Sequence, residues 1–177
     1  MELILIGYMG SGKSTLGKLL DGFMGKKYYD LDLFIKEKEK KSIQEIFSQR
    51  KEAYFREKEK EYLTYFLTHY KHYILSVGGG TPCFYNNIHL MKEFAKVFYL
   101  KVDPIELKRR LLVEKEQRPI LSLIPKENLM NFIKNQLIQR EPFYSQAHYQ
   151  ISCSKRSTIA LTSEISDIFL KRKDDSF

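Results

Sequence analysis

Short apolar runs recur along the chain and alternate with longer stretches in which apolar residues follow a helical period. The runs Leu3–Ile6, Tyr73–Val77, Lys96–Leu100 and Tyr149–Ser152 predict strands, and Tyr28–Tyr29 predicts a weaker one. These runs are apolar at successive positions rather than at alternate ones, which is typical of parallel strands buried on both faces. We therefore expect a parallel sheet covered by helices.

The stretches between the runs carry helix signals. Ser42 followed by Glu45 forms a capping-box pattern ahead of an apolar segment. Lys126–Gln146 is helical in period until Pro142 perturbs it, and Thr158–Lys171 has the pattern of a closing helix. Because strand and helix alternate throughout, the sequence predicts an α/β fold, a three-layer α/β/α sandwich with a five-stranded parallel sheet.

Composition narrows the class of protein. The 177 residues are 43% hydrophobic and 29% charged, the mix of an ordinary globular chain. No linker divides the sequence, so we expect one domain over residues 1–177, with a polar tail at about 171–177. The opening run Met1–Ile6 is too short to span a bilayer and has no leader or cleavage pattern. We expect a cytoplasmic monomer with no membrane partner.

The formal net charge of +8 would suit small anions, nucleic acid or an anionic membrane. Most basic residues, however, stand among acidic ones, as in the run Lys36–Lys41. This alternation is typical of a solvated helix face rather than of a nucleic-acid patch. We therefore expect small anionic ligands and no nucleic acid.

A phosphate-binding loop follows the first strand. Gly7–Thr15 fits G-x-x-x-x-G-K-[ST], with a strand before it and an amphipathic helix after it. Successive backbone N–H groups and the helix N-terminus can hold phosphates, Lys13 can bridge the β- and γ-phosphates, and the Ser14 hydroxyl can bind Mg²⁺. The motif predicts nucleoside triphosphate binding, without identifying the acceptor. The predicted nucleotide-binding residues here are Gly10, Ser11, Gly12, Lys13, Ser14 and Thr15.

Five further short motifs carry a resemblance to a known family. They are Asp30-Leu31-Asp32, Phe55-Arg56-x-x-Glu59, Gly78-Gly79-Gly80, Arg118-Pro119-Ile120-Leu121 and Arg140-x-x-x-Tyr144. With the phosphate loop, they resemble the shikimate kinase family in order and approximate spacing, over roughly Leu3 to Leu170. The resemblance implies a P-loop kinase of the nucleoside monophosphate kinase-like fold. Such an enzyme transfers the γ-phosphoryl group of ATP to the 3-hydroxyl of shikimate, with Mg²⁺, in aromatic amino acid biosynthesis.

The resemblance assigns the acceptor site. Arg56 and Arg140 would clamp the carboxylate of shikimate through forked, charge-assisted hydrogen bonds. Asp32 would accept from the attacked hydroxyl, as a base or as an orienting group. Backbone N–H groups of the Gly78–Gly80 triplet (Gly78, Gly79 and Gly80) would face the substrate, and Glu59 would hold Arg56 in place. Phe47 and Phe55 match apolar positions of the acceptor pocket.

The resemblance also assigns the metal, the lid and the nucleotide contacts. Asp30 would hold Mg²⁺ through water, together with Ser14. The segment at about 113–125 would be a lid that excludes water, and Arg118 would stabilise the transferring phosphate. Arg110 matches a position near the adenine or the phosphates, and Arg156 lies in the segment that corresponds to the adenine loop. Lys13, Asp32 and Arg118 are the expected catalytic residues.

The sequence departs from the family pattern at two places. The family usually has a glycine ahead of the glutamate that precedes Phe-Arg, and this chain has Lys51-Glu52. The segment Thr81–Phe84 follows the triple glycine, where Val or Ala is commoner. Neither change removes a charged group that the reaction needs, so we expect both to affect only the fine shape of the pocket.

Two other functions fit parts of the pattern. A gluconate or nucleoside monophosphate kinase would share the phosphate loop but not the arginine pair beside Asp32. A non-catalytic nucleotide-binding homologue would have lost Lys13, Asp32 or Arg118, and all three are present. Asp30 and Asp32 could also serve only as helix caps.

Overall fold

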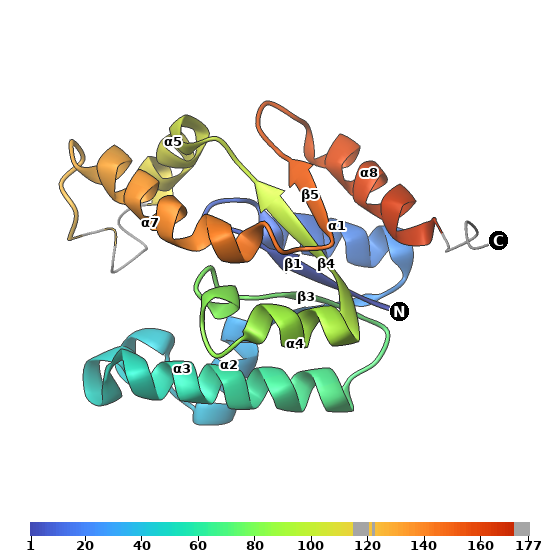
Figure 1. The fold of residues 1–177 in the computed structure, drawn as a ribbon, viewed down its shortest axis with the longest axis horizontal. Coiled ribbons are helices and arrows are strands. Elements are labelled where there is room, and N and C mark those ends of the chain that lie inside the picture. The colour runs from blue at the N-terminus through green and yellow to red at the C-terminus, as the bar shows by residue number, and fades with distance from the viewer. Residues whose placement is uncertain (115–120, 122, 172–177) are drawn as a thin grey trace.

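The structure is a computed structural model that describes residues 1–114, 121 and 123–171. Its five strands form one parallel sheet in the order β2-β3-β1-β4-β5 (Figure 1). All five predicted strands are confirmed. Their bounds are β1 Glu2–Ile6, β2 Lys27–Asp30, β3 Tyr73–Ser76, β4 Ala95–Lys101 and β5 Tyr149–Ser152.

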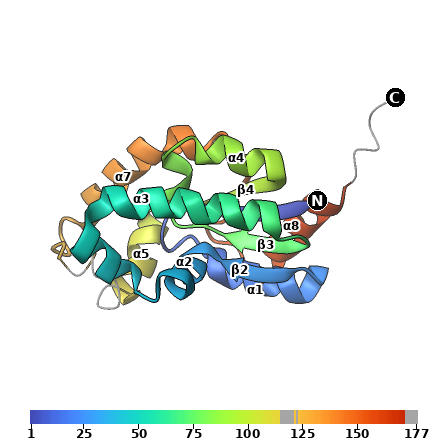
Figure 2. The ribbon, with the colours of Figure 1, turned by 90° about the horizontal axis from the view of Figure 1, so that it is seen from below.

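The helices cover both faces of the sheet, which confirms the predicted three layers. Helices α1 and α8 lie on one face, and α3, α4 and α7 lie on the other (Figure 2). Among the described residues the helices are α1 Lys13–Met24, α2 Leu31–Glu39, α3 Ile43–His69, α4 Asn87–Phe94, α5 Pro104–Glu114, α7 Leu129–Tyr144 and α8 Thr158–Leu170, with a 3₁₀ turn η1 at Thr81–Cys83. None of the helices in these ranges combines the length and apolarity needed to cross a bilayer.

The central strand β1 explains why its sequence is apolar at successive positions. Leu3, Ile4, Leu5 and Ile6 are all fully buried. Leu3 pairs with Ile74 of β3 on one side and with Lys96 of β4 on the other, while both faces of β1 lie under helices. Burial of both faces of a central strand removes the polar alternation of a solvent-facing strand.

The strand order creates the place for a ligand. The chain runs from β1 through β2 to β3 on one side of β1, and it then crosses to β4 on the other side. Ligands of open α/β sheets bind outside the carboxyl ends of the strands at such a reversal. The phosphate loop lies there, between β1 and α1, and α5 packs beside it: an added Cβ at Gly10 would lie 3.0 Å from Leu111.

Two helices differ from their predicted form. Helix α7 continues through Pro142 to Tyr144, so the expected perturbation at Pro142 does not end it there. Helix α3 begins with the predicted capping box of Ser42 and Glu45, but it is broken at Lys51, whose backbone has φ 67° and ψ 169°. Two helical segments therefore meet at the position where the sequence pattern of the family has a glycine.

Candidate active site

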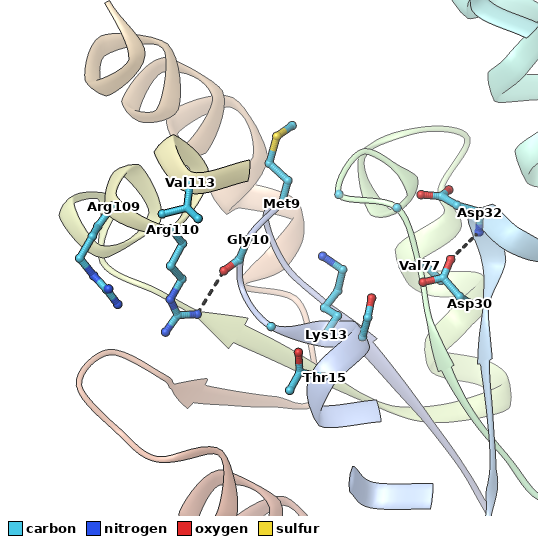
Figure 3. A pocket seen from close by; sticks show the side chains of 14 residues that line it. Met9, Gly10, Lys13, Thr15, Asp30, Asp32, Val77, Arg109, Arg110 and Val113 are labelled. Atoms are coloured by element: carbon cyan, nitrogen blue, oxygen red, sulfur yellow. Dashed lines mark hydrogen bonds between the residues drawn. The ribbon is translucent and has the colours of Figure 1, made fainter. Parts of the chain in front are cut away.

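One cavity of about 510 Å³ opens at the carboxyl ends of β1, β2 and β3 (Figure 3). It brings together residues that lie far apart in the sequence, from the phosphate loop, the Asp-x-Asp segment, the glycine triplet and α5. Polar side chains and backbone predominate, as an anionic ligand requires. The lining residues are Met9, Gly10, Gly12, Lys13, Ser14, Thr15, Asp30, Asp32, Val77, Gly78, Gly79, Arg109, Arg110 and Val113.

The phosphate loop has the backbone geometry that its glycines predict. Gly12 has φ 95° and precedes α1, so the helix begins at Lys13 with its N–H groups open to the cavity. The Lys13 ammonium donates to the carbonyls of Gly7 at 2.9 Å and Tyr8 at 3.1 Å. This curls the loop around one cation beside the cavity, as phosphate binding requires.

Helix α5 adds cationic side chains on the side of the loop away from the acceptor residues. Arg110 donates to the Gly10 carbonyl at 3.1 Å, and Glu106 accepts from its guanidinium at 2.9 Å (Figure 3). Arg109, which the sequence analysis did not select, also lines the cavity. Only its position in the fold identifies it, because an exposed Arg next to Arg110 in a charged helix carries no motif.

Asp30 is held by both carboxylate oxygens. Its Oδ1 accepts from the N–H of Asp32 at 3.0 Å and of Leu33 at 3.3 Å, so it caps α2 as well as lining the cavity. Its Oδ2 accepts from the hydroxyls of Tyr28 at 3.2 Å and Ser76 at 3.0 Å. The helix-capping role therefore coexists with the candidate metal role.

The donor set of the cavity fits a magnesium ion bound together with phosphates. Ser14, Asp30 and Asp32 present hydroxyl and carboxylate oxygens to the same space. Mg²⁺ prefers oxygen ligands and takes one or two carboxylates, keeping waters and substrate phosphates for its other positions. Within the described ranges no cluster of three or more His, Cys, Asp or Glu side chains is placed to hold a metal ion.

Asp32 has an environment unlike that of Asp30. Burial and, after it, the neighbouring Asp30 and Glu59 carboxylates raise the pKa of Asp32 to about 6, even though the Lys13 and Arg56 cations oppose the rise. An added Cβ at Gly78 would lie 3.1 Å from Asp32 Oδ1, so a side chain there would push against the carboxylate. Asp32 thus faces the cavity with a pKa that is closer to neutral pH than the pKa of an ordinary aspartate.

Arg56 comes from the second segment of α3 and lies beside the glycine triplet. Its Nη1 donates to Glu59 at 2.8 Å, and its Nη2 donates to the more exposed Glu52 at 3.1 Å. An added Cβ at Gly80 would lie 2.5 Å from Nη2, so only glycine leaves room for this guanidinium. The structure therefore confirms the expected contact of Glu59 with Arg56. Phe55 is buried in the core nearby.

Arg140 comes from α7 and approaches the triplet from another direction. Its Nη1 lies 3.1 Å from where a Cβ of Gly79 would stand, and Gln136 accepts from its Nη2 at 2.5 Å. The Tyr144 hydroxyl donates to the Gly79 carbonyl at 2.5 Å, which ties α7 to the same loop. Arg56 and Arg140 thus lie against successive glycines, although neither is among the residues that line the cavity itself.

Not every predicted residue belongs to this arrangement. Arg156 pairs with Glu164 of α8 and donates to the Ser152 carbonyl at 3.2 Å, and it does not line the cavity. Its nucleotide-binding role stays a prediction. Arg118 and most of the expected lid lie outside the described residues, as does the side chain of Phe47.

Comparisons with known proteins agree with one another. The sequence model of the family described as "Shikimate kinase" matches residues 9–171. A shikimate kinase of Phocaeicola vulgatus is 44% identical over 148 residues, which cover 84% of each chain. A crystal structure of the shikimate kinase of Bacteroides thetaiotaomicron matches with a TM-score of 0.89 and 37% identity, covering 95% of this chain and 97% of that one. The shikimate kinase of Acinetobacter baumannii in complex with shikimate matches with a TM-score of 0.88 and 28% identity, covering 98% and 95%.

Proposed function

The chain belongs to the shikimate kinase family, and we propose that it transfers the γ-phosphoryl group of ATP to the 3-hydroxyl of shikimate. The products are shikimate 3-phosphate and ADP. The observation that carries this proposal is the meeting of Asp32, Arg56 and Arg140 around the glycine triplet, beside the phosphate loop.

The acceptor side of the site has the charge and shape to bind and orient shikimate. Two guanidinium groups on neighbouring glycines, Gly79 and Gly80, can bind one carboxylate through forked hydrogen bonds. Asp32 then accepts from the attacked hydroxyl and orients its oxygen toward the γ-phosphate. Because the transition state of phosphoryl transfer is loose, this orientation matters more than complete deprotonation.

The nucleotide half neutralises phosphate charge. Lys13 and the N–H groups at the start of α1 bind the phosphates, and Arg110 flanks the same cavity. When bound through Ser14 and Asp30, Mg²⁺ would shield the charge on the β- and γ-phosphates. The family resemblance adds Arg118 as the residue that approaches the transferring phosphate. Cytoplasmic location and the monomeric state stay predictions from the sequence.

The test is ADP release with a panel of acceptors. With Mg²⁺ and ATP, shikimate should stimulate release steeply, while gluconate and nucleoside monophosphates should not. Arg140→Gln should raise the KM for shikimate and leave that for ATP nearly unchanged, because Arg140 lies on the acceptor side. Stimulation by one of the other acceptors, with none by shikimate, would refute the assignment. A rate of ADP release that no acceptor changes would favour a non-catalytic or hydrolytic role.

A further inference from the structure

The turn that follows the glycine triplet departs from the sequence pattern of the family, and the structure gives that departure a role. We propose that Thr81 and Phe84 are positioning residues for the acceptor carboxylate, which they serve by fixing the guanidinium of Arg56. This inference rests on the proposed function, in which Arg56 binds that carboxylate. Neither residue lines the cavity, so both act through Arg56.

Glu59 connects Thr81 to Arg56. Its side chain is fully buried, and its two oxygens have different partners: Oε2 accepts from Arg56 at 2.8 Å and Oε1 accepts from the Thr81 hydroxyl at 2.6 Å. A buried carboxylate is stable only when its oxygens are paired. The Thr81 hydroxyl therefore fixes the plane of the carboxylate on which Arg56 is oriented.

Thr81 is itself held rigidly. It is fully buried, its N–H donates to the Gly78 carbonyl at 3.0 Å, and its own carbonyl accepts from the side chain of Asn87 at 3.0 Å. The hydroxyl thus reaches Glu59 from a fixed backbone. A valine or alanine at this position could occupy the space but could not donate, so Glu59 would lose its Oε1 partner.

Phe84 fixes the same guanidinium from another direction. The Arg56 Cζ lies 4.3 Å from the centre of the Phe84 ring, within the range of a cation–π contact. Gly80, at the start of the same turn, leaves room for Nη2. One short segment, Gly80–Phe84, therefore holds Arg56 in three ways: by the close approach of its backbone, by a cation–π contact and, through Thr81 and Glu59, by a buried carboxylate.

This arrangement predicts a selective effect on the acceptor. An arginine fixed before binding loses less conformational entropy when it captures a carboxylate, so removal of its supports should weaken shikimate binding. In the part of the chain that the structure describes, Thr81 bonds to Gly78, Glu59 and Asn87, and Phe84 contacts Arg56, so the affinity for Mg·ADP should stay the same. A role confined to folding would not separate the two ligands.

The experiment measures the affinities of the full-length protein for shikimate and for Mg·ADP by calorimetry. Thr81→Val should weaken shikimate binding about tenfold, because a hydrogen bond to a charged group is lost. Thr81→Ser should restore it, and Phe84→Leu should weaken it about threefold. Mg·ADP affinity should stay within about twofold throughout. The matched controls are Thr162→Val, another buried threonine, and Phe23→Leu, an exposed phenylalanine on α1.

A second measurement tests whether Thr81 acts through Arg56. In an Arg56→Ala background, Thr81→Val should change shikimate affinity less than about twofold, since the group that it positions is gone. The inference is overturned if Thr81→Val binds shikimate as the unmodified protein does, if it weakens both ligands equally, or if its effect persists without Arg56. If the unmodified protein itself does not bind shikimate, the proposed function falls and this inference falls with it.

Discussion

Three carboxylates meet near the glycine triplet, and their surroundings differ. Asp30 caps α2 and accepts from two hydroxyls. Glu59 is paired with Arg56 and Thr81. Burial, and after it the two other carboxylates, raise the pKa of Asp32 to about 6. Asp30 and Glu59 are engaged by these partners, and the raised pKa of Asp32 suits it to accept the hydroxyl proton.

Replacement of Asp32 by asparagine should therefore have opposite effects on activity and on stability. Asp32→Asn keeps the shape but cannot accept a proton, so kcat should fall by about 10²–10⁴-fold while the affinity for Mg·ADP changes little. The metal-free variant should unfold at a higher temperature than the unmodified protein at pH 8, because it no longer buries a charge near Asp30 and Glu59. Steady-state kinetics and thermal unfolding in a chelator measure the two effects.

The sign of the pH dependence follows from the raised pKa. The folded protein holds a proton on Asp32 up to about pH 6, whereas the unfolded chain releases it near its ordinary value of 3.8. Asp32 thus stabilises the fold fully below the unfolded value, and this contribution is lost as pH rises through about 6. The gain from Asp32→Asn should be large at pH 8 and small at pH 4. A gain that does not vary with pH would contradict the raised pKa.

Lys51 offers a separate test at the residue scale. Its φ of 67° with ψ of 169° belongs to a region that is essentially restricted to glycine and costs other residues about 1–3 kcal/mol. Lys51→Gly should raise the free energy of unfolding by about 1 kcal/mol, despite the greater freedom of the unfolded chain. Denaturant titration measures this.

The control for Lys51 lies in the regular part of the same helix. Glu57 is exposed in the second segment of α3, so Glu57→Gly should lower stability by about 1 kcal/mol. Equal losses from Lys51→Gly and Glu57→Gly would mean that Lys51 has ordinary helical backbone.

Site residues that belong to a motif can be predicted from the sequence, whereas contacts between residues far apart in the sequence cannot. Lys13 and Ser14 could be predicted because a phosphate loop requires them at fixed spacing after a strand. The hydrogen bond of Thr81 with Glu59 joins residues 22 positions apart, and no spacing rule links them. The departure of Thr81 from the family pattern was visible in the sequence, but its partner was not.

At the scale of elements, the central strands could be predicted because they are buried on both faces. The helices could be predicted less well, because their ends and breaks depend on local backbone geometry. The run Leu3–Ile6 is apolar because both faces of β1 are covered. Proline is a weak guide near a helix end, since α7 runs through Pro142 for two more residues. The break of α3 at Lys51 has no propensity signal, because lysine is a good helix former.

Helix α1 contains two glycines that should respond to alanine in opposite ways. An added Cβ at buried Gly17 would lie 2.2 Å from the Tyr28 ring, whereas exposed Gly22 has nothing within 4 Å. Gly22→Ala should therefore stabilise the protein by about 0.5–1 kcal/mol, since alanine favours a helix over glycine. Gly17→Ala should destabilise it, because the Tyr28 ring, whose hydroxyl donates to the cavity residue Asp30, must move.

Thermal unfolding of both variants measures this difference, and Tyr28 supplies the internal check. Its hydroxyl lies 2.6 Å from Ser76 and 3.2 Å from Asp30. If Gly17→Ala displaces the ring, Mg·ADP affinity should fall along with stability, while Gly22→Ala should leave that affinity unchanged. Stabilisation by both alanines would refute the close packing of α1 on β2.

At the scale of the whole molecule, the class of fold could be predicted and the strand order could not be read from the residues alone. Alternating strands and helices predict a parallel sheet. Nothing in the runs themselves says that β3 inserts between β1 and β2 or that β4 lies on the far side of β1. That order places Asp30 and Asp32 on one side of the phosphate loop and Arg110 of α5 on the other (Figure 3).

The two ligands should therefore stabilise the fold independently. Shikimate alone, at about 100 times its Kd, should raise the free energy of unfolding by about 2.7 kcal/mol, and Mg·ADP should do the same at its own Kd. Arg140→Gln should abolish the first shift in melting temperature and keep the second, because Arg140 lies against Gly79 on the acceptor side. Lys13→Ala should do the reverse, because Lys13 lies at the start of α1 in the phosphate loop. The measurement is a melting curve of the unmodified protein and of the two variants with each ligand. If either variant loses both shifts, the two halves of the site form only as a unit, contrary to what the sheet order implies.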